Sequence, residues 1–310
     1  MKPKRISDPL KLNNLNVMRT IVYLFAAVSI LLLTAAAGDK PAYRVFNEKG
    51  KSSDYKDILK AASDADIIFF GELHDNALCH WLELELTRDL YDVKKERLVI
   101  GAEMFEADNQ LLLNEYTGKF IRKKDFEAEA KLWPNYKTDY APLVDFACGK
   151  GIRFVATNIP RRYAAAVNLK GFQALDSINA YQRAMIAPLP IKYDSTLNCY
   201  ASIAKAAEGG PGHSMHLGEA QAIKDATMAH FILKNWETGK SFLHFNGSYH
   251  SDDHAGIVWY VQNYGKRLPY IPKVITITCV EQDTLDELAS ENTGKADFII
   301  CIPASMTKTR

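Results

Sequence analysis

The 310-residue sequence lacks the features that mark several classes of protein. No C-x-x-C pair occurs among its five cysteines and their number is odd, so the sequence does not require a disulfide framework. It has no tract rich in serine, proline or glutamine, and 11% of its residues are aromatic, which excludes a mainly disordered chain. It contains only one long apolar run, which excludes a polytopic membrane protein.

Positive charge is concentrated near the N-terminus, and the rest of the chain is mildly acidic. The formal net charge is +1, whereas residues 1–37 carry a surplus of +4, which leaves −3 for residues 38–310. A mildly acidic body offers no electrostatic footprint for nucleic acid. We therefore expect no nucleic-acid partner.

The single long apolar run has the layout of a targeting segment. Residues 21–37 carry no charge, lie between Arg19 and Asp39, and end in three alanines before Gly38. The order of basic, apolar and small residues predicts a secretory signal peptide, and an uncleaved N-terminal anchor is the alternative. Residues 1–37 are thus predicted to direct export, which would make the protein periplasmic or otherwise associated with the cell envelope.

Short apolar runs rich in β-branched or aromatic residues recur after this segment, at residues 67–70, 98–100, 152–156, 242–245, 274–279 and 298–302. Longer amphipathic stretches separate the runs, and in residues 76–92 leucine recurs at every fourth position from Leu78 to Leu90. This alternation is typical of α/β folds. We predict a mainly parallel sheet flanked by helices, with one helix at 76–92.

The intervals between the predicted strands are uneven. The second and third runs, and then the third and fourth, are separated by far more chain than one crossover helix needs. Both intervals have helical patterns. We therefore predict helical insertions at about 108–142 and 161–236, which form a smaller helical subdomain within a single domain spanning 38–310.

Four predicted strands end in polar residues that carry chemistry. The first strand runs into Gly71-Glu72-Leu73-His74, and the fourth runs into Gly247-Ser248-Tyr249-His250. The second strand ends near Glu103, and the third ends at Asn158. Ligands of open α/β sheets bind outside the carboxyl ends of the strands. We expect these side chains to converge there.

Two imidazoles and two carboxylates suit a divalent ion such as Mn, Fe, Co or Zn, and a metal-bound water would be a hydrolytic nucleophile. Without a metal, the same residues could act as a glutamate base with histidine partners. Glu103 in an apolar strand needs a partner, which could also be an arginine. The candidates for both catalytic and metal-ligating roles are Glu72, His74, Glu103 and His250.

Further candidates for contacts with a cofactor lie in or near the second helical interval. Arg161 and Arg162 follow a proline that begins a helix, where they could bind an anionic group or form ordinary ion pairs. His213 and His216 lie beside a glycine-rich loop and could be ligands or solvated loop residues. With Asn158 at its strand end, these five residues are the predicted cofactor contacts.

An aromatic group lies in the first helical interval, at residues 133–136 and Tyr140. It could line a flat apolar pocket or pack in the core.

Six motifs in order resemble the ChaN-like haem-binding uptake proteins of the Tiki superfamily, whose other branches are TraB, Tiki and erythromycin esterase. The resemblance covers most of residues 60–265. The motifs are GELHDN at 71–76, GAEMFE at 101–106, TDYAPLV at 138–144, ATNIPRRYA at 156–164, KDATMA at 224–229 and GxxH at 247–250.

The resemblance implies a parallel-sheet α/β domain and an exported protein that binds haem, or iron, in haem or iron acquisition. It also implies possible envelope iron-uptake partners and a homodimer that encloses haem. Tiki-type relatives are metal-dependent peptidases, and that role would fall on Glu72, His74, Glu103 and His250. Two hypotheses follow: a haem-binding protein, and a metal-dependent hydrolase acting on a peptide or small molecule.

Overall fold

The computed structural model describes Tyr23, residues 40–207 and residues 216–309. Met1–Ala42 and Tyr43–Arg310 form two units, and the second contains all the elements discussed below. The predicted signal or anchor lies outside the described residues except for Tyr23, and His213 also lies outside them. Within the described ranges, no helix has both the length and the apolar character needed to cross a membrane.

The domain is built on one eight-stranded sheet with the order β2-β1-β8-β7-β3-β6-β4-β5. The strands from β8 to β5 are parallel to one another, and β1 pairs antiparallel with both β2 and β8. All six predicted strands are present, and the predicted α/β class with a mainly parallel sheet is confirmed. The strand bounds are β1 Arg44–Asn47, β2 Ser52–Ser53, β3 Ile67–Glu72, β4 Leu98–Glu106, β5 Arg153–Asn158, β6 Ser241–Gly247, β7 Val274–Gln282 and β8 Phe298–Pro303.

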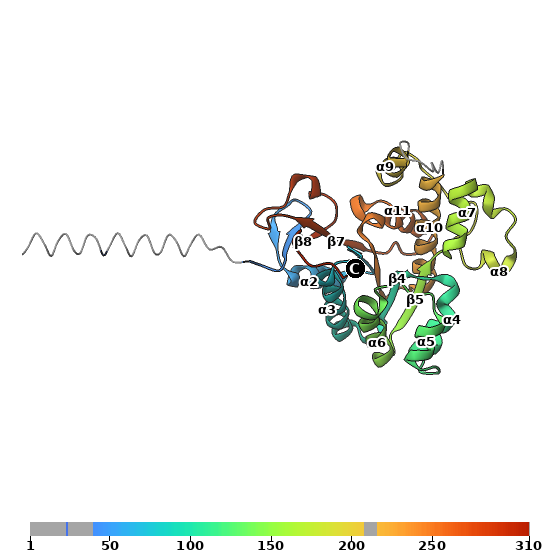
Figure 1. The fold of residues 1–310 in the computed structure, drawn as a ribbon, viewed down its shortest axis with the longest axis horizontal. Helices are drawn as coiled ribbons and strands as arrows, with labels where there is room; N and C mark the ends of the chain where they lie inside the picture. Colours follow the sequence, from blue (N-terminus) through green and yellow to red (C-terminus); the bar gives the residue numbers. More distant parts are fainter. Residues whose placement is uncertain (1–22, 24–39, 208–215, 310) are drawn as a thin grey trace, which may run out of the picture. The chain divides into compact units, whose positions relative to one another are not determined.

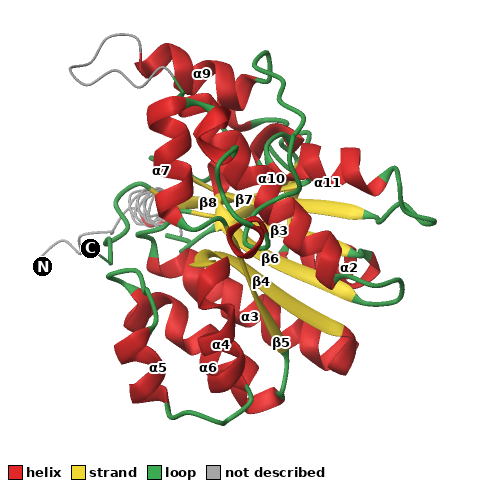
Figure 2. Ribbon diagram, turned by 90° about the vertical axis from the view of Figure 1, so that its right-hand side faces the viewer, coloured by secondary structure: helices red, strands yellow, loops and turns green. Residues whose placement is uncertain are grey.

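Helices cover both faces of this sheet (Figure 1). Figure 2 shows α3, α4, α5 and α6 on one side of the strands and α7, α10 and α11 on the other. The helix bounds are α2 Tyr55–Asp64, α3 Ala77–Lys94, α4 Gln110–Thr117, α5 Lys123–Glu129, α6 Ala141–Lys150, α7 Arg161–Lys170, α8 Ala180–Arg183, α9 Asn198–Ala207, α10 Leu217–Asn235 and α11 Ile257–Gly265.

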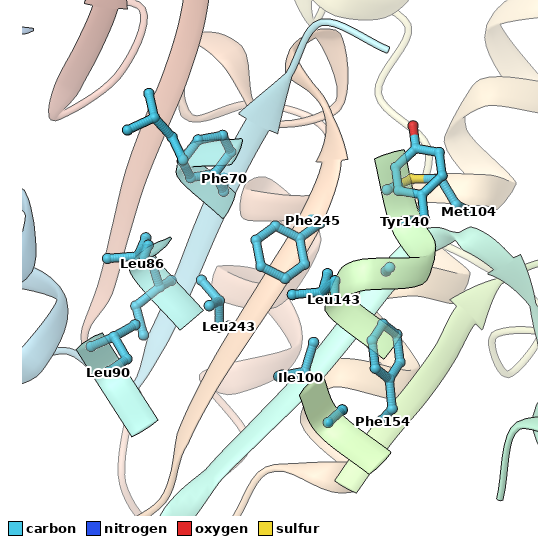
Figure 3. Close-up of a cluster of buried hydrophobic side chains, with 14 of the residues drawn as sticks. Phe70, Leu86, Leu90, Ile100, Met104, Tyr140, Leu143, Phe154, Leu243 and Phe245 are labelled. Atoms are coloured by element: carbon cyan, nitrogen blue, oxygen red, sulfur yellow. The ribbon is translucent and has the colours of Figure 1, made fainter. Parts of the chain in front are cut away.

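The alternation of side chains along the strands divides the core in two. Ile68 and Phe70 of β3 join a cluster with α2, α3, α4, α5 and α6, part of which Figure 3 shows. Ile67 and Phe69 point to the opposite face and pack with α9, α10 and α11. Because both faces are covered, the parallel strands are apolar along nearly their whole length. A few buried polar residues such as His244 and Thr276 lie inside them, and Glu72, Glu103 and Asn158 lie toward the carboxyl ends.

The predicted helix at 76–92 is α3, and its start is capped by Asn76. The Asn76 side-chain oxygen accepts hydrogen bonds from the backbone N–H groups of Leu78 and Cys79. Leu82, Leu86 and Leu90 are buried, as their spacing predicts. The cap fixes where the helix begins, directly after the first GxxH motif.

The two intervals contain several short helical elements and one long helix, the 19-residue α10. The first holds α4, α5 and a single π-turn, Tyr136–Tyr140, before α6. The second holds α7, α8, α9 and α10, and Tyr163, Val167 and Ile186 form a small apolar cluster there with Ile223 of α10. This cluster is the core of the smaller helical part.

Glycine at position 101 is required by packing inside the sheet. A Cβ at Gly101 would lie 2.6 Å from Phe242 Cε1 and 3.0 Å from Thr157 Cγ2. We expect Gly101→Ala to lower the free energy of unfolding by about 1–3 kcal/mol because the core has no room for it. The matched control is Gly149→Ala in α6, where a Cβ meets nothing within 4 Å and where we expect a gain of about 0.5–1 kcal/mol. Urea denaturation measures both, and equal effects of the two changes would contradict the packing argument.

Candidate functional site

The first GxxH motif builds a carboxylate–imidazole pair at the end of β3. Glu72 is the last residue of the strand and is 1% exposed. Its Oε1 lies 2.6 Å from His74 Nδ1 and accepts a hydrogen bond of 2.6 Å from the Tyr140 hydroxyl. Figure 3 shows Tyr140 at the edge of the apolar cluster with its hydroxyl pointing away from it. With Nδ1 held by the carboxylate, the other ring nitrogen of His74 is left as a base or ligand.

The second GxxH motif places His250 between two acids. His250 Nε2 lies 3.1 Å from Glu103 Oε1, and His250 Nδ1 is in close contact with Asp225 Oδ1. The other oxygen of Glu103 accepts the backbone N–H of Gly247 at 2.8 Å. The other oxygen of Asp225 accepts the Tyr200 hydroxyl at 2.7 Å. Each of the four carboxylate oxygens of Glu103 and Asp225 thus has a partner in this motif or in its neighbours.

Electrostatics favour the charged forms of Glu103 and His250. Burial alone would raise the pKa of Glu103, but the charge of His250 and its hydrogen bond hold that pKa well below its usual range. Burial alone would lower the pKa of His250, but Glu103 and Asp225 outweigh it and raise this pKa to about 10. His250 is therefore an imidazolium at neutral pH, and the Glu103–His250 contact is a buried ion pair.

The two motifs lie side by side because β3 and β6 are neighbours in the sheet. Glu72 is in register with Gly247, so both strands end at the same level. The absence of side chains at the two glycines lets the motifs approach. A Cβ at Gly247 would lie 2.7 Å from the His74 ring, and one at Gly71 would lie 2.9 Å from Ser248 Cα. The predicted convergence of Glu72, His74, Glu103 and His250 is therefore observed, as two acid–imidazole pairs.

A cavity of about 630 Å³ opens beside these pairs. His74 and Glu103 are among its lining residues, and Trp133, which also lines it, packs edge-on against the His74 ring with 4.8 Å between ring centroids. Apolar groups and cations make up much of the rest of its lining. The remaining lining residues are Glu106, Lys131, Leu132, Pro134, Asn158, Ile159, Arg161 and Lys224.

The predicted cofactor contacts divide between this cavity and other places. Asn158 and Arg161 line it, and Arg161 forms no ion pair within the described part of the chain. Arg162 instead pairs with Asp108 at 2.5 Å, which is the ordinary ion pair that the sequence left open. His216 pairs with Glu219 at 2.8 Å at the start of α10 and is not part of the cavity lining. The aromatic group serves both predicted purposes, because Trp133 lines the cavity while Tyr136 and Tyr140 are buried.

Three polar residues of the site were not assigned to it from the sequence. His80, Glu83 and Asp225 are buried on helices α3 and α10. His80 Nδ1 lies 3.1 Å from Glu83 Oε2 and 3.7 Å from Glu72 Oε2. Burial, and then the charge of Glu72, raise the pKa of Glu83 well above its usual range. The available signal was position: Glu83 falls on the same helical stripe as Leu82, Leu86 and Leu90, where a carboxylate is out of place.

Comparison of the fold with solved structures finds similar proteins, of which three are described here. The chain matches a structure of cofacial haem binding to ChaN of Campylobacter jejuni, with a TM-score of 0.63 and 18% identity, over 84% of this chain and 97% of that one. An erythromycin esterase EreC mutant in its open conformation matches with a TM-score of 0.46 and 11% identity, over 85% and 98%. A type III effector, HopBA1, matches with a TM-score of 0.42 and 10% identity, over 79% and 91%. These likenesses concern the fold.

Comparison of the sequence identifies the family. No curated protein matches the chain. Residues 58–261 match the family described as "Haem-binding uptake, Tiki superfamily, ChaN". That match spans both GxxH motifs, the cavity lining and the buried helix residues, from α2 into α11. The chain belongs to the ChaN family of haem-binding uptake proteins in the Tiki superfamily.

Proposed function

We propose that this protein binds haem in the cavity beside His74 and serves in haem or iron acquisition. The observation that carries the proposal is the position of the His74 ring and the contact that fixes it. Its Nδ1 is held by Glu72, and its ring borders a cavity that combines an apolar wall with cations. A histidine whose Nδ1 is fixed by a carboxylate is a good donor to a metal through the other nitrogen.

The lining of the cavity fits the three parts of a haem. His74 would supply a nitrogen ligand to the haem iron. Trp133, Pro134 and Ile159 would contact the apolar porphyrin face. Arg161 would pair with a propionate, because it borders the cavity and has no acidic partner within the described residues. Haem would bring an iron centre to the site, and the chain would bind and orient it.

A haemin titration of the full chain, followed by visible absorbance, tests this assignment. We expect a saturable Soret shift, and we expect His74→Ala to weaken binding by about tenfold or more because the iron loses its ligand. The control is His230→Ala on α10, outside the cavity lining, which should leave the titration unchanged. No shift in the unmodified chain beyond that of an unrelated protein would reject haem binding, and equal effects of the two substitutions would reject His74 as the ligand.

The role assigned to Arg161 makes a separate prediction. Arg161→Gln should weaken haemin binding by about three- to fivefold, and the loss should shrink as salt is added, because the pair lies at the solvent edge. Arg267→Gln is the matched control, since Arg267 lines a different cavity beside α11. The measurement is the same titration at two salt concentrations. A salt-independent loss would show that Arg161 acts through packing instead of charge.

The proposal includes export to the cell envelope and a homodimer that shares haem. The support for export is the layout of residues 1–37, and the support for a shared haem is the description of the Campylobacter jejuni ChaN structure as cofacial. Fractionation of cells tests the first, with export giving the protein in the envelope or periplasm. Sedimentation with and without haemin tests the second, and an unchanged monomer at saturating haemin would contradict it.

A metal-dependent hydrolase is a second candidate function. The observation that favours it is that the two acid–imidazole pairs lie side by side at neighbouring strands, with one member of each pair, His74 and Glu103, in the lining of one cavity. In that function Glu72 or His74 would act as the base. Loss of peptide or ester hydrolysis in Glu72→Gln, with the fold intact by circular dichroism, would support it. Absence of any metal-stimulated hydrolysis by the unmodified chain would rule against it.

A further inference from the structure

A second cluster of ligand-type side chains lies on the α3 side of the strand end, apart from the cavity lining. In the described part of the chain, Glu72, His80 and Glu83 each offer one ligand atom, and these atoms lie within 4.8 Å of one another. All three side chains are buried, with 1%, 5% and 1% exposure. His80 and Glu83 are three residues apart on α3 and so share one face of it, opposite the end of β3.

The hydrogen bonds of His80 leave one of its nitrogens without an acceptable partner. His80 Nε2 lies 3.2 Å from the backbone oxygen of His74 and 3.5 Å from Asp139 Oδ2, and both groups can only accept when Asp139 is ionised. That nitrogen must therefore donate. In the neutral imidazole the lone pair is then on Nδ1, where the carboxylate oxygens of Glu83 and Glu72 lie at 3.1 and 3.7 Å. A lone pair facing carboxylates is repelled unless a proton or a metal cation lies between them, and a metal cation would use the imidazole and both carboxylates as ligands.

Two carboxylate oxygens of this cluster also lack a hydrogen-bond partner in the described part of the chain. Glu72 Oε2 and Glu83 Oε1 are buried and have no hydrogen-bond partner among the described residues. Glu72 Oε1 is already engaged by Tyr140 and His74, so it does not compensate for Oε2. Among residues 40–207 and 216–309, no lysine or arginine pairs with Glu72, Glu83 or Asp139. Buried carboxylates without a counter-charge are costly, and a positive species removes that cost.

We infer that Glu72, His80 and Glu83 form a binding site for one divalent transition-metal cation, such as Mn²⁺. One imidazole with two carboxylates is a nitrogen–oxygen donor set that suits Mn²⁺, Fe²⁺ or Zn²⁺. This site differs from the predicted set of Glu72, His74, Glu103 and His250, with which it shares only Glu72. Its other two ligands, His80 and Glu83, do not line the cavity proposed for haem, so the site can be tested without haem.

Mn²⁺ binding to the full chain, freed of metal by a chelator, tests the site. We expect about one Mn²⁺ per chain, read from the loss of the six-line electron paramagnetic resonance signal of free Mn²⁺. Glu83→Gln should raise the dissociation constant by about tenfold or more because it removes a ligand. Glu85→Gln removes the same charge from the same helix at a half-buried position paired with Arg88, and it should leave binding unchanged.

Two further measurements distinguish this site from a metal site among the strand-end residues. If Glu103→Gln abolishes Mn²⁺ binding while Glu83→Gln retains it, the metal lies among the strand-end residues and the inference is wrong. Electron spin echo modulation of the bound Mn²⁺ in the unmodified chain should show one imidazole nitrogen, whereas the predicted set would show two. This measurement decides the matter even if a variant fails to fold. Absence of stoichiometric Mn²⁺ binding would overturn the site and leave a proton shared by Glu72 and Glu83.

Discussion

Glu103→Gln is expected to lower the free energy of unfolding by about 3 kcal/mol near pH 6. The substitution keeps the shape of the side chain but removes the charge that faces His250 Nε2 at 3.1 Å. His250 would then be a buried imidazolium with Asp225 as its single acidic partner, and breaking a buried pair from one side costs about 3–5 kcal/mol. The hydrogen bond from the Gly247 N–H survives because an amide oxygen also accepts. The expected loss is therefore at the lower end of the range of about 3–5 kcal/mol.

The pH dependence of this loss follows from the two pKa shifts. Glu103 has a lowered pKa, so its contribution is present above its unfolded pKa of about 4.3 and is lost as the pH falls. His250 has a pKa raised to about 10, so its contribution is complete below its unfolded pKa of about 6.5 and disappears as the pH rises through about 10. The difference between the unmodified chain and Glu103→Gln should therefore be largest near pH 5–6 and shrink toward pH 10.

Urea denaturation at about pH 6 and pH 10 measures this difference. The control is Glu106→Gln at the end of the same strand, where Glu106 pairs with the exposed Lys131 at 3.2 Å and where we expect less than about 1 kcal/mol at either pH. An equal loss at both pH values would mean that Glu103 stabilises the fold by packing instead of by its charge. A loss no larger than that of the control would mean that the pair is solvated.

The strands and the place of the site could be predicted because both are encoded locally. A buried parallel strand must be apolar along its length, so the runs at 67–70 and 242–245 are visible without a structure. Where such a run changes to Gly-x-x-His, the chain leaves the sheet at its carboxyl edge. Hence the sequence alone predicts Glu72 and His250 as candidate site residues, and they lie at neighbouring strand ends.

The pairing of the site residues could not be predicted because it depends on strand order. β6 lies between β3 and β4, although it follows both by more than a hundred residues in the chain. This order brings Gly247 beside Glu72 and sets His250 against Glu103. A different order of the same strands would have paired other residues, and no local pattern selects among the orders.

The buried polar residues of the helices were missed for another reason. Asp225 lies on the stripe of α10 that also buries Ala222 and Ala229, and its neighbours in sequence do not reveal that its partner is His250. The antiparallel pair β1 and β2 was also missed, because its strands are short and only Val45 and Phe46 are buried. The deciding contact of Asp225 is with His250, and that of β1 is its pairing with β8, more than 250 residues later in the chain.

Gly256→Ala is expected to be the most damaging small substitution near the site, with a loss of about 3–5 kcal/mol in the free energy of unfolding. Gly256 has a φ of +53° and a ψ of −121°, which side chains other than glycine strongly disfavour. A Cβ there would also lie 2.3 Å from the backbone oxygen of His250 and 3.1 Å from Asp225 Oδ2. The strain and the clash add, and the clash falls on the segment that holds His250 against Asp225.

Gly151→Ala separates these two contributions. Gly151 ends α6 with a φ of +68° and a ψ of 28°, and a Cβ there meets nothing within 4 Å. Gly151→Ala should therefore lower the free energy of unfolding only by the cost of a left-handed backbone conformation, about 1–2 kcal/mol. Thermal and urea unfolding should place Gly256→Ala well below Gly151→Ala in stability. Equal losses in the two variants would mean that the backbone at His250 shifts to accept the Cβ at no cost. The close packing of Gly256 would then not be what holds the second motif in place.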